Sequence, residues 1–154
     1  QGINVFAQGI DGNATQVVEK FLRSKDSVLF GTSSLWEGVD IQGDSLKLVI
    51  MTKLPFDVPT DPIISARSEV YDEPFTQYSI PEALIKFRQG FGRLIRKKDD
   101  RGVFIILDKR IINNSYGKLF FQSLPDTNFK KTKIGMLDNE ITGWLSSNEL
   151  ENSK

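Results

Sequence analysis

The sequence predicts an α/β protein with a mostly parallel central sheet. Four short apolar segments are rich in β-branched and aromatic residues. They do not alternate with polar residues, which is typical of strands that are covered on both faces. The expected strands are Ile3–Ala7, Val28–Phe30, Leu46–Met51 and Val103–Leu107. Helical patterns separate these segments, and strand–helix–strand units favour parallel pairing.

Two amphipathic helices are expected between these strands. The first covers Asn13–Lys25, where Asn13 is a favourable N-cap and apolar residues recur at helical spacing. The second begins at Ser79, because Ser79 and Glu82 have the spacing of a capping box, and it runs to about Arg96. Its core-facing side chains are expected to be Leu84, Phe87, Phe91, Leu94 and Ile95.

The remaining segments are expected to be less regular. Leu54–Tyr78 contains four prolines, which leave room for only a short helix over Ile63–Val70. A further helix is expected near Asn114–Leu124. We predict one domain over residues 1–146 and a polar, frayed tail over residues 147–154.

Composition limits the chemistry that the chain can perform. Its 154 residues are 39% hydrophobic and 26% charged, which is ordinary for one globular domain. The lack of cysteine and histidine excludes disulfides, Cys-ligated zinc, iron–sulfur ligation, Cys nucleophiles and His bases. No apolar run is long enough to span a membrane, and a cytoplasmic location is expected. Because the chain starts with Gln1, we expect it to be a piece of a longer protein.

Charge is unevenly distributed along this neutral chain. Residues 86–133 contain 13 Lys or Arg and four Asp or Glu, a local charge of +9, and the remainder has a charge of −9. A basic segment of this kind indicates a surface for phosphate groups. The alternative is that these charges belong to a solvated helix face and a basic tail, which would give the same local charge.

Three polar side chains share one side of the second expected helix. At about 100° per residue, Gln89, Arg93 and Arg96 cluster within about 60°, away from the core face. Glycines at positions 90 and 92 weaken the helix, so another backbone or a ligand is expected to approach closely there. Paired guanidinium groups suit a polyphosphate, because arginine presents a planar fork and keeps its charge. A solvated basic face is again the alternative.

The loop over residues 31–40 carries three hydroxyl groups, one tryptophan and two acids. Hydroxyl groups can hold sugar–phosphate oxygens, and a carboxylate can accept from a ribose hydroxyl. Turn chemistry around Gly38 explains the acids as well, and Trp36 is expected in the core unless it stacks on a base. Polar residues that follow the strands predict a ligand site at the carboxyl edge of the sheet. They are Gln8, Gly9, Gly31, Thr32, Ser33, Thr52, Lys53, Asp108, Lys109 and Arg110.

Two segments resemble motifs of the DinG/XPD branch of superfamily 2 helicases. FGTSSLWEGVDIQGDSL is similar to motif V of that family, and QGFGRLIR fits its motif VI pattern, Q-x-x-G-R-x-x-R. KLPFDVPTDP, VFIILDKRI and NNSYGK resemble the segments between and after these motifs, so the likeness covers nearly the whole chain in order. The resemblance implies a RecA-like, P-loop NTPase-like three-layer sandwich, the second domain of a helicase. It also implies a motif IV strand before Gly2, and thus a sheet that lacks an edge strand here.

The resemblance implies roles for the matching residues. The catalytic residues, which would face the γ-phosphate of ATP and include an arginine finger, are Gln89, Arg93 and Arg96. The residues at the nucleotide cleft would be Glu37, Asp40 and Gly92. The residues on the DNA backbone would be Thr32, Ser33 and Gln8. No metal ligand is expected in this chain.

The resemblance also implies partners outside the chain. ATP and Mg²⁺ would be held mainly by a first RecA-like domain of the same polypeptide, since the sequence has no G-x-x-x-x-G-K-[ST] phosphate loop. Single-stranded DNA is the expected substrate, and no membrane is expected to take part. This fragment alone is predicted not to hydrolyse ATP.

Three other functions compete with this interpretation. One is a non-catalytic α/β module that binds nucleic acid through the +9 segment. Another is a part of a DinG-type protein whose main activity is an upstream exonuclease domain. A dinucleotide-binding domain fits poorly, because Gly90 and Gly92 lie inside a helical pattern and no G-x-G-x-x-G follows a strand.

Overall fold

The computed structural model describes residues 2–32, 34–35, 41, 46–97, 100–125 and 127–151. For residues 145–151 it describes the backbone only. The chain divides into two compact units, residues 1–124 and residues 125–154.

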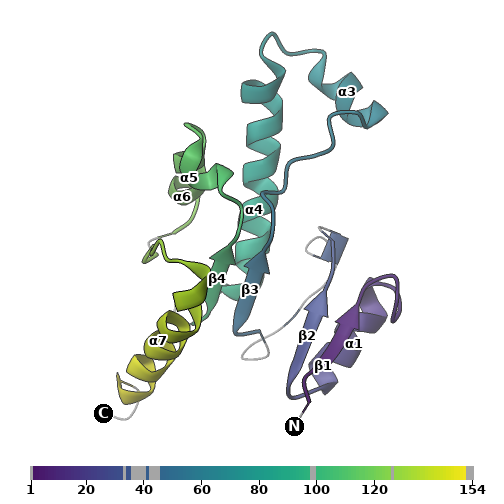
Figure 1. The fold of residues 1–154 in the computed structure, drawn as a ribbon. Coiled ribbons are helices and arrows are strands. Elements are labelled where there is room, and N and C mark those ends of the chain that lie inside the picture. The colour runs from purple at the N-terminus through teal and green to yellow at the C-terminus, as the bar shows by residue number, and fades with distance from the viewer. Residues whose placement is uncertain are drawn as a thin grey trace. The chain divides into compact units, whose positions relative to one another are not determined.

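The first unit opens with a parallel β–α–β segment. β1 (Asn4–Ala7) pairs with β2 (Ser27–Phe30), and α1 (Ala14–Arg23) connects them (Figure 1). Asn13 forms a full capping box, because its side chain accepts from the Gln16 N–H and its own N–H donates to the Gln16 side chain. The helix and its predicted cap are therefore confirmed. The buried residues of α1 are Val17, Val18 and Phe21.

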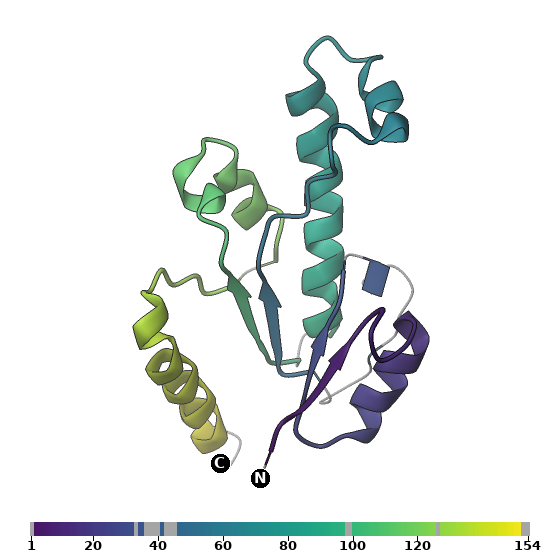
Figure 2. The same cartoon turned by 45° about the vertical axis from the view of Figure 1, so that its right-hand side comes forward.

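A second parallel pair completes the strands. β3 (Leu48–Met51) pairs with β4 (Val103–Ile106), and α4 (Ile80–Leu94) lies between them in the sequence. Figures 1 and 2 show α1 beside β1 and β2, and α4 running along β3 and β4. All four predicted strands are present, and both pairs are parallel as expected.

An irregular excursion joins β3 to α4, as its prolines predict. It contains α3 (Pro62–Ser68), where the Asp61 side chain accepts from two backbone N–H groups of the first turn. A π-helical turn, η2 (Phe75–Ser79), follows and continues directly into α4. The predicted capping box at Ser79 is therefore wrong. Ser79 already has a helical backbone, with φ −65° and ψ −41°, and its side chain caps nothing because no helix end lies there.

Two short helices follow β4. They are α5 (Arg110–Asn113) and α6 (Gly117–Gln122), so the helix predicted near residues 114–124 is confirmed and one more turn precedes it. The two helices approach closely at Gly117. A Cβ at this position would lie 1.9 Å from the Ile111 carbonyl oxygen, so any larger residue would separate them.

The main core of the first unit lies around α4. Phe87 is fully buried and makes edge-to-face contacts with Phe104 and Phe120, at centroid distances of 5.6 Å and 5.1 Å. Such contacts add to the free energy that ring burial already contributes. The buried cluster consists of Met51, Leu54, Ala83, Phe87, Ile111 and Phe120.

The strands are not covered on both faces, contrary to the prediction. Val5 is 56% exposed, Phe30 60% and Ile50 51%. The four strands also form two separate two-stranded sheets, so β2 and β3 are not hydrogen-bonded neighbours. In the described part of the chain, the sheet is therefore interrupted between β2 and β3, and not merely shortened at an edge as expected.

The second unit is small and helical. It contains a 3₁₀ turn, η3 (Ile134–Met136), and α7 (Leu137–Glu151), which extends into the segment expected to fray. Lys130 and Glu140 form an ion pair within it. None of the helices in the described residues has the length and apolar character needed to cross a membrane.

Candidate functional site

Polar side chains meet where β1 and β2 end. The Gln8 side-chain oxygen accepts from the Thr32 N–H at 3.1 Å and from the Thr32 hydroxyl at 3.3 Å. The Gln8 amide nitrogen donates to the Ser34 hydroxyl at 2.8 Å, and the hydroxyls of Thr32 and Ser34 are 2.9 Å apart. Thr32 and Ser34 are exposed, and Gln8 is partly buried. This carboxyl-end cluster of Gln8, Thr32 and Ser34 offers a fixed amide and two hydroxyls to a ligand.

The sequence predicted two members of this cluster as contacts to nucleic acid. The structure brings Gln8 and Thr32 together, because the Gln8 N–H continues the parallel ladder by donating to the Phe30 carbonyl at 2.9 Å. Ser34 was not singled out, although it belongs to the same run of hydroxyl residues. Its hydroxyl could contact nucleic acid in the same way, since hydroxyl groups commonly bind sugar–phosphate oxygens.

A second polar group lies where β3 and β4 end. Asp108 accepts from the Arg110 guanidinium at 2.6 Å and 2.9 Å, and from the Leu54 N–H at 2.8 Å. The Arg110 hydrogen bonds and the Leu54 N–H hold the pKa of Asp108 at about 2, although burial acts in the opposite direction. The same pair raises the pKa of Arg110. Asp108 therefore joins the ends of both strands through the hydrogen bond from Leu54, and the Arg110 fork holds its carboxylate in place.

The loop after β3 is held at two further points. Phe56 stacks beside Phe75, and the Arg110 guanidinium lies 5.3 Å from the Phe56 ring centroid. Asp57 forms an ion pair with Lys86 of α4. The Arg110 guanidinium thus pairs with Asp108 and contacts the Phe56 ring, so its charge already interacts with groups of the same unit. The carboxyl end of β3 and β4 thus serves mainly to fix the loop.

The end of α4 carries the arginines that the sequence predicted. Gln89 is exposed, and Arg93, one turn further along, is partly buried. α4 ends at Leu94, and Ile95 has an extended backbone, with φ −119° and ψ 108°. Arg96 therefore lies beyond the helix, and the prediction of one helical face for all three side chains is wrong.

The turn that follows α4 is stabilised by the side chain of Asp100. The Asp100 carboxylate accepts from the N–H groups of Arg96 and Lys97, each at 2.8 Å. These two hydrogen bonds, the one from Lys97 first, lower the pKa of Asp100. This local capture of backbone donors competes with continued helix, which two nearby glycines already disfavour. At Gly92, one of those glycines, a Cβ would meet nothing within 4 Å in the described structure.

The arginines do not lie beside the carboxyl end of the sheet, contrary to the prediction. α4 runs in the direction opposite to β3 and β4, so its last turn lies near the amino ends of these strands (Figure 1). A Cβ on Gly102, just before β4, would come within 2.3 Å of the Leu94 side chain. The loop that joins α4 to β4 is short, so the helix has to end where the strand begins. Gln8 and Thr32 thus lie at the carboxyl ends of β1 and β2, whereas the last turn of α4 lies near the amino ends of β3 and β4.

Several predicted site residues lie outside the described part of the chain. They are Ser33, Trp36, Glu37 and Asp40. The predictions for these residues therefore stay predictions.

Comparison with known proteins identifies the fold's family. The family described as helicase C-terminal domain matches residues 1–127, which include the whole first unit. Within the described residues, the architecture is mixed α/β with small parallel sheets, which is consistent with such a domain.

Three relatives illustrate the likeness. An ATP-dependent DNA helicase YoaA from Haemophilus influenzae is 45% identical over 129 residues, which are 81% of this chain and 20% of the relative. A 3'-5' exonuclease DinG from Bacillus subtilis is 40% identical over 150 residues, 94% of this chain and 16% of the relative. An ATP-dependent DNA helicase DinG from Photobacterium profundum is 52% identical over 105 residues, 66% of this chain and 15% of the relative.

The chain spans one fifth or less of the length of each of these relatives. The family matches most of this chain, and the relatives carry DinG and YoaA names. The chain therefore belongs to the helicase C-terminal domain family and is of the DinG type.

Proposed function

We propose that this chain is the second motor domain of an ATP-dependent DNA helicase, and that its fold completes a RecA-like three-layer sandwich in the parent protein. Relatives named ATP-dependent DNA helicase support this proposal, as does the motif VI pattern at the end of α4. In this scheme, ATP and its Mg²⁺ bind mainly to a first domain of the same polypeptide. This domain closes over the nucleotide.

The observation that carries the proposal is the placement of Gln89, Arg93 and Arg96 around the last turn of α4. Arg93 is partly buried and thus held by the fold, and Arg96 is exposed just beyond the helix. A guanidinium that approaches the γ-phosphate stabilises the charge that develops there during phosphoryl transfer. We assign this role to Arg93 and Arg96, with Gln89 beside them.

The carboxyl-end cluster has a separate role in this scheme. Gln8, Thr32 and Ser34 present an amide and two hydroxyls, which bind the sugar–phosphate backbone without selecting a base sequence. These residues follow the carboxyl ends of β1 and β2, whereas Arg93 lies near the amino ends of β3 and β4. Nucleotide and strand would therefore contact different ends of one domain. Closure over ATP then alters the grip on the strand, and hydrolysis releases it.

Substitution of the arginines tests the catalytic assignment. In the parent protein, Arg93→Ala and Arg96→Ala should each lower the kcat of DNA-stimulated ATP hydrolysis by about 10³-fold or more, because the transition state loses a guanidinium. The Kd for single-stranded DNA should change little. Steady-state ATPase assays and fluorescence-anisotropy titrations measure the two quantities.

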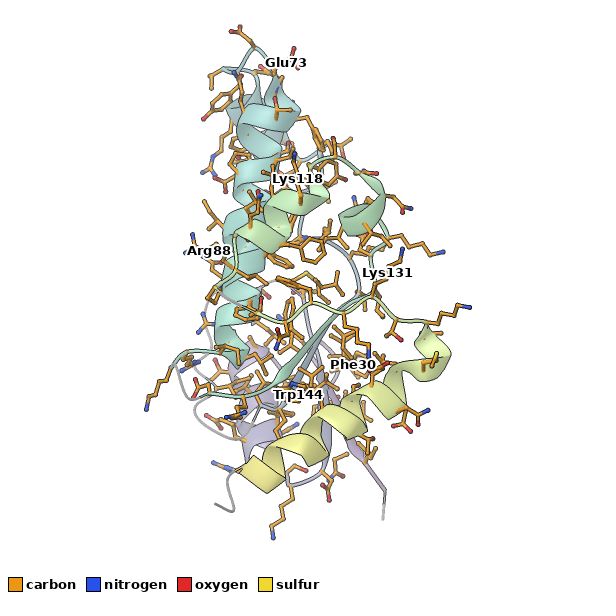
Figure 3. All side chains as sticks on the ribbon, turned by 90° about the vertical axis from the view of Figure 1, so that its left-hand side faces the viewer. Phe30, Glu73, Arg88, Lys118, Lys131 and Trp144 are labelled. Carbon is orange, nitrogen blue, oxygen red and sulfur yellow. The ribbon has the colours of Figure 1, made fainter. Side chains whose placement is uncertain are left out.

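Arg88→Ala is the matched control. Arg88 lies on the same helix and is exposed, projecting from its outer side (Figure 3). Its loss removes the same charge from α4 without touching the proposed site, so kcat should be nearly unchanged. A collapse of DNA affinity with turnover preserved in Arg93→Ala and Arg96→Ala would contradict the assignment.

A second function has one specific observation in its favour. The Bacillus subtilis relative, named as an exonuclease, matches 94% of this chain. The parent protein would then act mainly as a nuclease, and this domain would serve to bind nucleic acid. Degradation of labelled single-stranded DNA from its 3' end by the parent protein, without ATP, favours this alternative. ATP-dependent strand separation without degradation favours the helicase.

A non-catalytic binding module is the remaining alternative. Strong binding of single-stranded DNA by this chain alone, with a steep dependence on salt, would support it, because phosphate contacts release counterions. The helicase proposal expects weak binding by the isolated chain, since the strand is then gripped by only one of two domains.

A further inference from the structure

The loop that joins β1 to α1 is fixed by its own hydrogen bonds. Figure 2 shows this loop at the head of the β1 arrow. The N–H groups of Ile10 and Asp11 both donate to the Ala7 carbonyl, at 3.1 Å and 2.9 Å. The Asp11 carboxylate accepts from the Ala7 N–H at 2.8 Å, and the Gly9 N–H donates to the Gly12 carbonyl at 2.8 Å. The loop is therefore closed on itself and cannot change shape without losing several of these bonds.

Two glycines and one lysine set the shape of this loop. Gly9 and Gly12 have positive φ angles of 84° and 148°, which other residues rarely adopt. A Cβ on Gly12 would also lie 2.7 Å from the side-chain oxygen of Gln16. From α1, the Lys20 ammonium donates to the Asp11 carbonyl at 2.6 Å. The loop is thus held from two sides, by β1 and by α1.

Ile10 lies at the tip of this loop. It is 85% exposed, more than any other large hydrophobic side chain in the described part of the chain. Single exposed apolar residues are common on protein surfaces. Here, however, a fixed loop holds the side chain in solvent, and the other residues over positions 8–13 are glycine or polar. A matching partner would therefore offer a small apolar surface with polar groups around it.

The loop begins at the carboxyl-end cluster. Gln8, whose side chain binds Thr32 and Ser34, pairs with Gly12 in a parallel bridge across the base of the loop. Ile10 lies midway between these two residues in the sequence. A strand whose backbone is bound by the cluster would therefore pass beside Ile10. The inference below rests on this proposed contact of the cluster with DNA.

The chemistry of the tip indicates which part of a nucleotide Ile10 would contact. Residues 1–19 contain no lysine or arginine, and Asp11 is an acid, so the tip is a poor site for a phosphate. The Ile10 side chain has no donor or acceptor for the oxygens of a sugar. An unstacked base, in contrast, has a flat apolar face with polar groups at its edges. The base is therefore the part of the nucleotide that fits.

We propose that Ile10 packs against the face of one base in the single strand whose backbone the carboxyl-end cluster binds. Apolar side chains of other DNA-binding proteins insert between bases and separate them. Such a contact tolerates any sequence, because every base has a flat face. Ile10 would then be a positioning residue. It holds one base away from its neighbour and fixes the register of the strand on this domain, while the cluster holds the backbone.

Binding of natural and abasic DNA to the parent protein tests the proposal. Ile10→Ala should raise the Kd for a fluorescent oligothymidylate by about tenfold, because most of an apolar contact is lost. The Kd for an oligonucleotide of the same length without bases should not change, since Ile10 then has nothing to contact. Ile10→Leu keeps the apolar bulk and should bind oligothymidylate nearly as well as the natural protein. Fluorescence anisotropy measures each Kd.

Two further variants serve as controls. Ile3→Ala removes the same side chain from the position just before β1, where Ile3 is 66% exposed, and should change neither Kd. Thr32→Ala removes a hydroxyl of the carboxyl-end cluster. It should raise the Kd for both oligonucleotides to a similar degree, because the cluster contacts the backbone that they share.

The outcomes separate this inference from the proposed function. If Thr32→Ala weakens binding of both oligonucleotides while Ile10→Ala weakens neither, or weakens both alike, the cluster binds the strand and Ile10 contacts no base. If Ile10→Leu binds as weakly as Ile10→Ala, apolar bulk is not what the strand contacts, and the inference is wrong. If Thr32→Ala changes neither Kd, the proposed DNA contact of the cluster is itself wrong, and the inference built on it fails as well.

Discussion

The two strand pairs of the first unit differ in how completely they build their own core. The β3–β4 pair packs against α4, α5 and α6 around Phe87 and Phe120, both fully buried. The β1–β2 pair has α1 alone, and Val5 and Phe30 remain more than half exposed. Burial of apolar surface is the largest stabilising contribution to folding, so the β3–β4 pair should hold most of the stability.

The residues proposed to bind the DNA strand therefore lie in the less stable half of the first unit. The carboxyl-end cluster of Gln8, Thr32 and Ser34 lies on the weakly packed half, where small shifts cost little free energy. Arg93 lies on α4, which belongs to the well-packed half. The proposed motor would need a rigidly held arginine and a grip on the strand that changes with nucleotide state, and this division is compatible with both.

The largest expected effect is that of Phe87→Ala. Phe87 is fully buried and contacts two other rings, so its truncation should lower the free energy of unfolding by about 3–5 kcal/mol. Phe21→Ala in α1 removes the same ring from a smaller core, where the residue is 9% exposed, and should cost less. Urea unfolding of the chain, followed by circular dichroism, gives both values. Equal losses would show that the two halves are packed alike.

A smaller effect is expected for Asp108→Asn. The substitution keeps the shape of the side chain but removes the charge that binds Arg110 and the Leu54 N–H, at a cost of about 1.5–3 kcal/mol. The pKa of Asp108 is about 2 in the fold and 3.8 as the reference value. Its contribution is therefore present above pH ~4 and is lost as the pH falls toward ~2. Urea unfolding between these pH values should show this dependence in the natural chain and not in the variant.

Asp57→Asn is the control for that measurement. Asp57 also pairs with a cation, Lys86, but its side chain is 26% exposed, against 9% for Asp108. Solvent weakens such a pair, so the loss should be no more than about 1 kcal/mol. If Asp57→Asn destabilised the chain more than Asp108→Asn, Asp108 would not be the main link between the ends of β3 and β4.

Local patterns in the sequence were enough to predict most elements of the fold. Apolar runs predicted the four strands, and the spacing of Asn13 and the α1 apolar residues predicted a helix with its cap. Ser79 shows the limit of such patterns. Its spacing to Glu82 is that of a capping box, yet η2 supplies a preceding helical turn, and a π-helical turn leaves no clear sequence signal.

The site was predicted in parts, and its layout was not. Gln8 and Thr32 were expected at the ends of parallel strands, and they meet there because β1 and β2 are paired in register. The position of Arg93 was misjudged, although the short connection from α4 to β4 already implies that the helix ends at the amino end of that strand. The backbone position of Arg96 depends on Asp100, four residues later, whose carboxylate accepts hydrogen bonds from two backbone N–H groups. A helical projection cannot include that competition.

The smallest effect, and the one that examines the weaker half alone, is expected for Asn13→Ala. The Asn13 side chain accepts from the Gln16 N–H at 3.0 Å, and its loss leaves an N-terminal donor of α1 without its cap, at a cost of about 1 kcal/mol. Asn13→Ser should be nearly neutral, because serine caps a helix equally well. In a half with a single covering helix, this loss should also speed exchange of the β1 and β2 amides while those of β3 and β4 are unaffected. Equal acceleration in both strand pairs would mean that the first unit unfolds as one cooperative body. The two halves would then differ in packing but not in stability.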